Sequence, residues 1–212
     1  MNLVSEQTGI GPEIEAIIFD AFGTLCEITE PRRPFAQLAR SCPDRQHARE
    51  VLMTSSLSLR DAARELQVEG IDLDELEADL AVELASVRLY PEVIEMLEAV
   101  RARGFKIAIA SNLAAPYAAP LLRLLPFKLD VYAWSFEVGY LKPDPRIYRW
   151  TCHRLGIEPE QALMVGDTFV ADYEGARGAG MHALYLDRAG TSKHDVPSLM
   201  TLDVATVSPH LS

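Results

Sequence analysis

The stretch that decides the fold is Ala16-Ile-Ile-Phe-Asp20, which runs directly into Ala21-Phe-Gly-Thr-Leu25. A short, unbroken apolar run of this kind predicts a strand buried on both faces, the habit of a parallel sheet. Working outward, three more runs share its character: Lys106-Ile-Ala-Ile-Ala110, Ala162-Leu-Met-Val165 and His182-Ala-Leu-Tyr-Leu186.

Helical patterns separate these runs. They cover residues 91–103, 144–155 and 170–179, and each stops before a glycine that can take a left-handed capping conformation. The alternation of strand and helix predicts an α/β fold with a doubly wound parallel sheet, whose active edge lies at the carboxyl ends of the strands.

One long stretch breaks the alternation. Residues 30–89 carry no strand pattern, residues 45–66 are good helix formers, and Asp72-x-x-Glu75 opens a run of leucines at helical spacing. We therefore expect a small all-helical cap domain at 30–89, lying over the strand ends, and a core domain made of 1–29 and 90–212. Residues 199–204 are expected to form an edge strand.

Composition excludes several classes of protein. The 212 residues include 20 Lys and Arg against 31 Asp and Glu, a formal charge of −11, which argues against nucleic-acid and anionic-membrane partners. No run approaches the roughly 18–20 apolar residues of a membrane span. The start lacks a signal pattern, and Cys26, Cys42 and Cys152 form no C-x-x-C pair. We expect a cytoplasmic monomer or homodimer with free thiols.

Polar residues follow or closely succeed the predicted strands, where they can share one crevice. They are Asp20, Ser111, Asn112, Lys142, Asp167 and Asp172. Three carboxylates at one place repel one another unless a hard cation such as Mg²⁺ lies among them. Ser111 and Lys142 suit the oxygens of a phosphoryl group, and Asp20 is the candidate nucleophile. Each element alone is more often a turn or a helix cap, so the specificity lies in the ordered set.

That ordered set resembles the four motifs of the haloacid dehalogenase (HAD) superfamily. The matching residues are Asp20-x-x-Gly-Thr-Leu, Ser111-Asn, Lys142-Pro-Asp-Pro and Gly166-Asp-x-x-x-x-Asp172. The helical insertion matches the superfamily's cap in position and character only.

The resemblance implies a HAD-like, Rossmann-type core and an enzyme that hydrolyses a small anionic substrate through an aspartyl-phosphate at Asp20. It also implies one role for each matching residue. Mg²⁺ would bind Asp20, Asp167 and the backbone carbonyl of Phe22, with Asp172 ordering the metal shell. Ser111 and Lys142 would hold the phosphoryl oxygens with support from Thr24. Asn112 and Phe22 would contact the substrate.

Phe22 departs from the phosphatase pattern, which has a second Asp at this position to protonate the leaving group. Losing such help typically lowers turnover ~10²–10⁴-fold. We favour a phosphatase that acts on a phosphate ester or acyl phosphate. In such an enzyme either another group supplies the proton or the substrate has a good leaving group. A non-catalytic relative that keeps the fold for binding is a further alternative.

A 2-haloacid dehalogenase is the remaining alternative, because displacing halide needs no protonation and such enzymes also begin Asp-Ala-aromatic-Gly-Thr-Leu. Their last motif, however, is typically Ser-Ser-Asn-x-x-Asp, whereas this chain has Gly166-Asp167. The cap arginines that could hold a haloacid carboxylate are Arg32, Arg33, Arg40, Arg49 and Arg60. A phosphonatase-like Schiff base is excluded, since no lysine occurs between Cys26 and Tyr90.

Overall fold

A five-stranded parallel sheet forms the centre of the protein, in a computed structural model that describes residues 13–188. Its strand order is β5-β4-β1-β6-β7, so the strand directly before Asp20 is the middle one. The strands are β1 (Ala16–Phe19), β4 (Lys106–Ser111), β5 (Val131–Trp134), β6 (Ala162–Gly166) and β7 (His182–Tyr185). All four predicted strands are present, and β5 is an addition at one edge.

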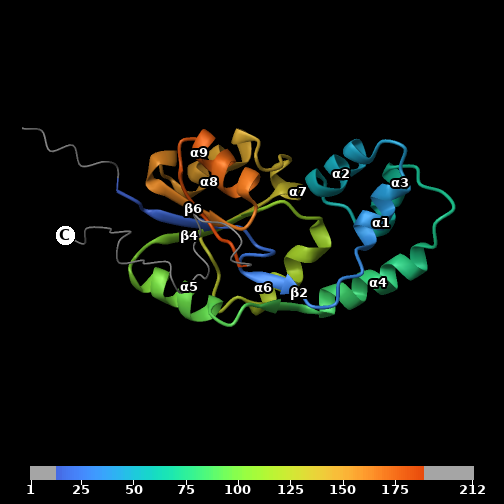
Figure 1. The fold of residues 1–212 in the computed structure, drawn as a ribbon, viewed down its shortest axis with the longest axis horizontal. Coiled ribbons are helices and arrows are strands. Elements are labelled where there is room, and N and C mark those ends of the chain that lie inside the picture. Colours follow the sequence, from blue (N-terminus) through green and yellow to red (C-terminus); the bar gives the residue numbers. More distant parts are fainter. Residues whose placement is uncertain (1–12, 189–212) are drawn as a thin grey trace, which may run out of the picture.

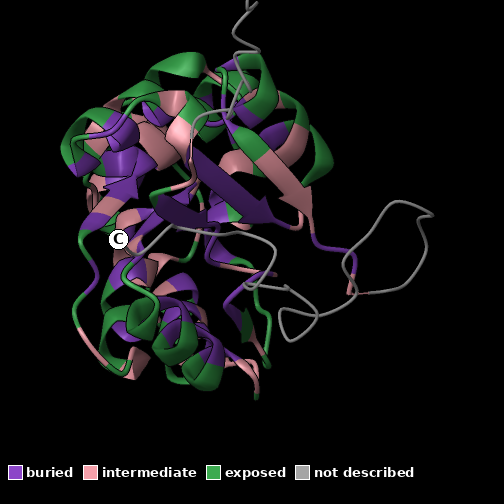
Figure 2. Cartoon of the chain, turned by 90° about the vertical axis from the view of Figure 1, so that its left-hand side faces the viewer, coloured by how far each residue is buried: buried purple, intermediate pink, exposed green. Residues whose placement is uncertain are grey.

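Helices cover both faces of the sheet, as the α/β prediction requires (Figure 1). Ile17 and Phe19 of β1 pack with α5 (Val93–Ala102) and α6 (Ala118–Leu124). The alternate residues, Ala16 and Ile18, face α8 (Pro145–Leu155) and α9 (Gly175–Gly178). Figure 2 shows the result, with the central strands buried and the outer faces of the helices exposed.

The predicted helix boundaries hold best where capping residues fix them. Asp144 accepts a hydrogen bond from the Arg146 backbone at the start of α8, and Gly156 ends that helix at φ +68°. The single helix expected over 170–179 is instead a π-helical turn, Phe169–Glu174, followed by α9.

Four helices form a second unit between two short strands. They are α1 (Pro34–Arg40), α2 (Arg45–Thr54), α3 (Leu59–Glu65) and α4 (Leu73–Ala85), and residues 34–85 are called the helical insertion below. Its apolar side chains form one cluster, which includes Leu38, Leu52 and Leu59 and extends to Ala114 of the core. Asp72 caps α4 by accepting from the backbone of Asp74 and Glu75.

The expectation of no strand between β1 and Pro91 is wrong. β2 (Cys26–Ile28) and β3 (Val87–Leu89) pair antiparallel where the chain enters and leaves the insertion. Strands of three residues are too short to show a periodic pattern, and these two arise because the chain's outgoing and returning segments run side by side.

Hydrogen bonds tie the insertion to the core at two places. The Ser135 hydroxyl, at the start of α7 (Ser135–Val138), donates to the carbonyl of Met53 on α2 at 2.6 Å. The buried Glu83 on α4 accepts from the backbone N–H groups of Arg32 and Arg33 and from the Tyr117 hydroxyl. Burial first, and then the Glu83 carboxylate, raise the pKa of Tyr117, so it stays a hydrogen-bond donor.

Among residues 13–188, no helix is both long and apolar enough to cross a membrane. The strand expected at 199–204 lies outside the described residues.

Candidate active site

The structure brings the predicted motifs together at the carboxyl edge of the sheet. Asp20 follows β1, and its backbone N–H donates to the carbonyl of Val165 on the neighbouring strand at 2.9 Å. Ser111 ends β4 on the other side, and Asp167 follows β6. The strand order thus places three sequence-distant side chains around one point, as expected for a crevice at the strand ends.

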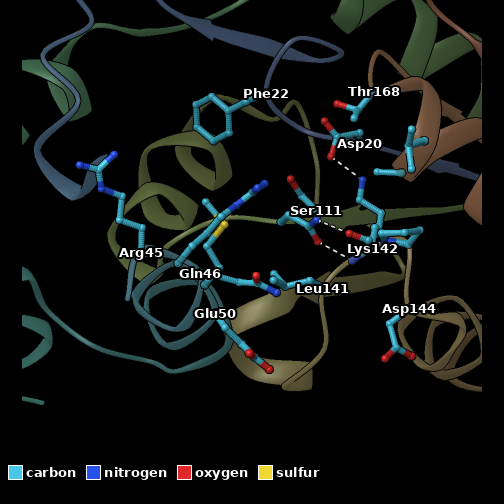
Figure 3. A pocket seen from close by; sticks show the side chains of 16 residues that line it. Asp20, Phe22, Arg45, Gln46, Glu50, Ser111, Leu141, Lys142, Asp144 and Thr168 are labelled. Atoms are coloured by element: carbon cyan, nitrogen blue, oxygen red, sulfur yellow. Dashed lines mark hydrogen bonds and ion pairs between the residues drawn. The ribbon is translucent and has the colours of Figure 1, made fainter. Parts of the chain in front are cut away.

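Lys142 is the buried cation of this cluster. Its ammonium donates to Oδ1 of Asp20 at 2.7 Å and to Oδ1 of Asp172 at 2.6 Å, and the Asp20 contact is drawn in Figure 3. Burial alone would lower the pKa of Lys142, but the two carboxylates outweigh it and hold that pKa above its usual value. An ammonium has three N–H donors, so one is left for a substrate oxygen.

Asn112 fixes the segment that carries this lysine. Its amide nitrogen donates to the Lys142 carbonyl at 2.8 Å, and its oxygen accepts from the Lys142 backbone N–H at 2.7 Å (Figure 3). Asn112 therefore positions Lys142. It also lines the cavity described below, and its contact with substrate stays a prediction.

Three carboxylates form a potential metal site. Oxygens of Asp20, Asp167 and Asp172 lie within 4.8 Å of one another. Burial first, and then the charge of Asp20, raise the pKa of Asp167 to about 6. Its buried Oδ1 finds no hydrogen-bond partner in the described part of the chain. An all-oxygen donor set with an unpartnered buried carboxylate oxygen fits Mg²⁺.

Asp172 is held more firmly. One of its oxygens bonds to Lys142, and the other accepts from the Thr168 backbone N–H at 2.9 Å. Burial raises the pKa of Asp172, and Lys142 acts in the opposite direction. Asp172 thus aligns Lys142. Its role in ordering a metal shell stays a prediction from the sequence.

Two glycines make room for these carboxylates. A Cβ atom on Gly23, which has a φ of +90°, would lie 2.0 Å from Oδ2 of Asp167. A Cβ atom on Gly166 would lie 2.3 Å from Cγ of Asp172. Any side chain at either position would displace a carboxylate, which explains why glycine occupies both.

Arg188 holds the loop that follows Asp20, a role that the sequence did not reveal. Its guanidinium donates to the carbonyls of Gly23 at 3.0 Å and Thr24 at 2.6 Å, and pairs with Glu92 at 2.7 Å. It also stacks 3.5 Å over the ring of Tyr90. A lone arginine after the last predicted strand offers no pattern that could have identified it.

Thr24 is buried within this loop. Its hydroxyl has no hydrogen-bond partner among residues 13–188, and the residue is not part of the cavity wall. Its predicted support of the phosphoryl oxygens therefore stays a prediction.

A cavity of about 930 Å³ lies between the strand ends and α2 of the helical insertion. Asp20, Phe22, Ser111 and Lys142 line its core side (Figure 3). The insertion contributes Arg45, Gln46, Arg49, Glu50 and Met53. Of the cap arginines singled out in the sequence, only Arg49 is part of this wall. The other insertion residues were missed, because helical spacing alone does not show which face of α2 meets the cavity.

Phe22 joins the core to the insertion. Its ring packs edge-to-face on Tyr117, with 5.9 Å between centroids, and Tyr117 in turn contacts Phe35 of α1 at 5.8 Å. The position where the motif resemblance leads us to expect an acid is therefore filled by an apolar contact.

The raised pKa of Asp167 predicts a pH-dependent response to Mg²⁺. The unfolded carboxyl ionises near its ordinary value of 3.8, but the folded one only near 6. Protonated Asp167 therefore makes its full contribution to the stability of the folded state below about pH 4, and this contribution is lost as the pH rises through 6. We expect Mg²⁺ to raise the melting temperature of the protein more at pH 7.5 than at pH 5, because it compensates the ionised carboxylate.

Differential scanning fluorimetry measures this effect. Asp167→Asn should keep its metal-free stability across the same pH window and respond weakly to Mg²⁺. An equal Mg²⁺ effect at both pH values in the unmodified protein would contradict the assignment.

Comparison with known proteins defines the class. Residues 14–180 match the family model of haloacid dehalogenase-like hydrolases, and the chain belongs to that family. The structure resembles a HAD phosphatase from Thermococcus onnurineus, with a TM-score of 0.62, 23% identity, and coverage of 91% of this chain and 98% of that one. At this identity the likeness shows the fold alone.

Individual relatives include both phosphatases and dehalogenases. The chain is 36% identical to a glyceraldehyde 3-phosphate phosphatase of Methanopyrus kandleri over 121 residues, which are 53% of this chain and 52% of that protein. It is 28% identical to (S)-2-haloacid dehalogenase 4A of Burkholderia cepacia, covering 89% of this chain and 93% of that one. The chain spans only 41% to 54% of the length of three phosphatases that it matches.

Proposed function

We propose that this protein is a Mg²⁺-dependent phosphatase that acts on a small phosphorylated metabolite, with Asp20 as the nucleophile. The observation that carries the proposal is the cluster of Asp20, Asp167 and Asp172, in which a buried oxygen of Asp167 lacks a partner within the described residues. Lys142 pairs with Asp20 and Asp172 but not with Asp167, so a partly buried third carboxylate is left that a cation would stabilise. A cation beside the nucleophile also suits a charged phosphoryl group.

In the first step, an oxygen of Asp20 attacks phosphorus, the bond to the leaving oxygen breaks, and an aspartyl-phosphate forms. Lys142 orients Asp20 through Oδ1, which leaves the other oxygen to attack. The third N–H of Lys142 and the Ser111 hydroxyl donate to phosphoryl oxygens.

In the second step, water attacks the phosphorus of the intermediate, the bond between phosphorus and the Asp20 oxygen breaks, and Asp20 is restored as a carboxylate. Inorganic phosphate leaves with one proton of the attacking water, and the other passes to the solvent. Bound Mg²⁺, held by Asp20, Asp167 and the Phe22 carbonyl with Asp172 nearby, would supply charge neutralisation at the phosphoryl group.

A 2-haloacid dehalogenase is the second candidate, favoured by the apolar Phe22 and by the likeness to the Burkholderia enzyme over most of its length. The two functions share the nucleophile but differ in their need for metal. The discriminating assay measures phosphate release from acetyl phosphate and p-nitrophenyl phosphate, and halide release from L-2-chloropropionate, each with Mg²⁺ and with EDTA.

Metal-dependent phosphate release supports the proposal. Halide release that persists in EDTA supports the dehalogenase instead. If neither phosphate nor halide is released from any of these substrates, the result supports a non-catalytic relative.

Phe22 predicts a steep dependence on the leaving group. Phenylalanine transfers no proton, so the leaving oxygen departs unprotonated, and acetyl phosphate should be cleaved far faster than an alkyl phosphate. Comparing kcat/KM for acetyl phosphate with that for an alkyl phosphate tests this.

Phe22→Asp should raise kcat/KM for the alkyl phosphate ~10²-fold or more, while kcat/KM for acetyl phosphate changes little, because this parameter reports only the steps up to formation of the aspartyl-phosphate. Phe22→Leu is the matched control, since it removes the ring contact with Tyr117 without adding an acid. Equal rates for the two substrates in the unmodified enzyme would mean that another group supplies the proton.

We further propose that residues 30–89 act as a cap over the core formed by 1–29 and 90–212, supported by the place of α2 on the cavity wall. We also propose a cytoplasmic location, in keeping with the free and buried Cys26, Cys42 and Cys152, and a monomer or homodimer as the oligomeric state.

A further inference from the structure

From the hydrogen bonds that Arg188 makes to the loop after Asp20, we infer that this residue positions the metal site. Its forked guanidinium fixes the peptide between Phe22 and Gly23, and with it the Phe22 carbonyl that is proposed to bind Mg²⁺. Arg188 is a positioning residue, because it acts through the loop. The inference rests on the proposed Mg²⁺-dependent function and adds a residue that lies outside the motifs carrying the family resemblance.

Gly23 is held through both of its peptide groups. Its N–H donates to the Cys26 carbonyl at 2.8 Å, and its own carbonyl accepts from Nε of Arg188 at 3.0 Å. Because a trans peptide is planar, the Phe22 carbonyl points away from the Gly23 N–H, so the bond to Cys26 sets the direction of that carbonyl. Glycine turns freely about its backbone bonds, so Gly23 keeps this direction only while its surroundings hold it.

The same glycine determines the place of a second proposed metal ligand. A Cβ atom on Gly23 would overlap Oδ2 of Asp167, so the backbone of Gly23 packs directly against this carboxylate. The Phe22 carbonyl and the Asp167 carboxylate are therefore both placed by the position of one residue. A shift of Gly23 would disturb two ligands of the site at once.

The guanidinium of Arg188 is itself held in place. Its Nη2 donates to the Thr24 carbonyl at 2.6 Å, its Nη1 pairs with Glu92 at 2.7 Å, and the group stacks 3.5 Å over the ring of Tyr90. All three guanidinium nitrogens are thus engaged, and a rigid planar fork can reach two carbonyls and a carboxylate together. A lysine ammonium carries its donors on one point and cannot reproduce this geometry.

Charge and position lead to opposite expectations for Mg²⁺ binding. A guanidinium beside the metal site repels the cation, so its removal would tighten Mg²⁺ binding if charge alone mattered. If Arg188 acts by holding Gly23, its removal should weaken binding instead. Losing a group that orients metal ligands typically costs ~10–100-fold in metal affinity. The direction of the change in affinity therefore distinguishes the two roles.

Isothermal titration calorimetry of Mg²⁺ with the full chain tests the inference. Arg188→Lys keeps the charge and removes the fork, whereas Arg188→Gln removes both, and each should raise the Kd for Mg²⁺ by ~10-fold or more. An unchanged or lowered Kd in either variant would overturn the inference.

Val100→Ala is the matched control for lost stability. Val100 is fully buried near the other end of α5 from Glu92, so its truncation lowers the melting temperature by leaving a cavity far along the helix. Its Kd for Mg²⁺ should equal that of the unmodified protein, even where its melting temperature falls as far as in the Arg188 variants. A Kd raised equally in Val100→Ala would reduce the effect of Arg188 to general stability and refute its positioning role.

Amide hydrogen exchange in the metal-free protein separates this inference from the proposed function. The Gly23 amide should lose protection in Arg188→Lys and keep it in Val100→Ala, because its bond to Cys26 depends on the hold on Gly23. If the amide behaves in this way but the unmodified protein binds no Mg²⁺, the proposed function fails and Arg188 still fixes the peptide. Equal protection of Gly23 in Arg188→Lys and in the unmodified protein would refute the role of Arg188.

Discussion

Asp20→Asn is expected to lower turnover by about 10⁴-fold or more, because an amide oxygen cannot attack phosphorus to form a stable acyl phosphate. The substitution keeps the shape of the side chain, and its oxygen can still accept from Lys142, so the fold should persist. Steady-state phosphate release and circular dichroism measure the two effects. Mass spectrometry after rapid quenching should detect a phosphorylated peptide that contains Asp20 in the unmodified enzyme and none in the variant.

Asp144→Asn is the matched control. Asp144 lines the same cavity but is engaged with Arg146 at the start of α8, where asparagine is also a good capping residue. Its activity should stay close to that of the unmodified enzyme. If activity survived in Asp20→Asn and fell in Asp144→Asn, Asp20 would not be the nucleophile.

Lys142→Met is expected to produce the largest loss of stability. Removing this ammonium leaves Asp20 and Asp172 buried without their cation, and breaking a buried ion pair from one side typically costs about 3–5 kcal/mol. The melting temperature should fall steeply, and Asp172→Asn added to Lys142→Met should restore part of the loss because it removes one of the stranded charges. Thermal and urea unfolding of the single and double variants measures both changes.

Lys106→Met provides the control for Lys142→Met. Lys106 is partly exposed, and its 3.7 Å contact with Glu15 is a surface ion pair, which contributes about 0–1 kcal/mol. A Lys142→Met protein that melts no lower than Lys106→Met would show that the buried cluster does not depend on this cation.

The sequence predicted the centre of the fold because buried parallel strands have a distinctive composition. Ala16-Ile-Ile-Phe19 and its three counterparts are short apolar runs ended by polar residues, and each forms the expected strand. The edge strand β5, Val131–Trp134, was not predicted, since Val-Tyr-Ala-Trp is followed at once by a helix and no turn residue marks its end.

The residues of the candidate site that directly follow a strand were predictable from the sequence. Those whose contacts depend on how loops pack together were not. Asp20, Ser111 and Asp167 come together because their strands are neighbours. Both polar groups of the Asn112 side chain form hydrogen bonds with the backbone of Lys142. These bonds depend on how two loops pack together, which the spacing of residues in the sequence does not reveal. The same holds for Arg188, which donates to the carbonyls of Gly23 and Thr24 more than 160 positions away in the chain.

The pairing of β2 with β3 has a consequence for how such a protein can diversify. Because Cys26–Ile28 and Val87–Leu89 lie side by side, the whole insertion begins and ends at one spot on the core. A segment with adjacent ends, whose apolar cluster takes only Ala114 and Tyr117 from outside residues 34–85, can be replaced by another without moving any strand of the sheet. The residues proposed for catalysis thus stand on the core, and the helices that form the opposite wall of the cavity are joined to it by a ribbon three residues long.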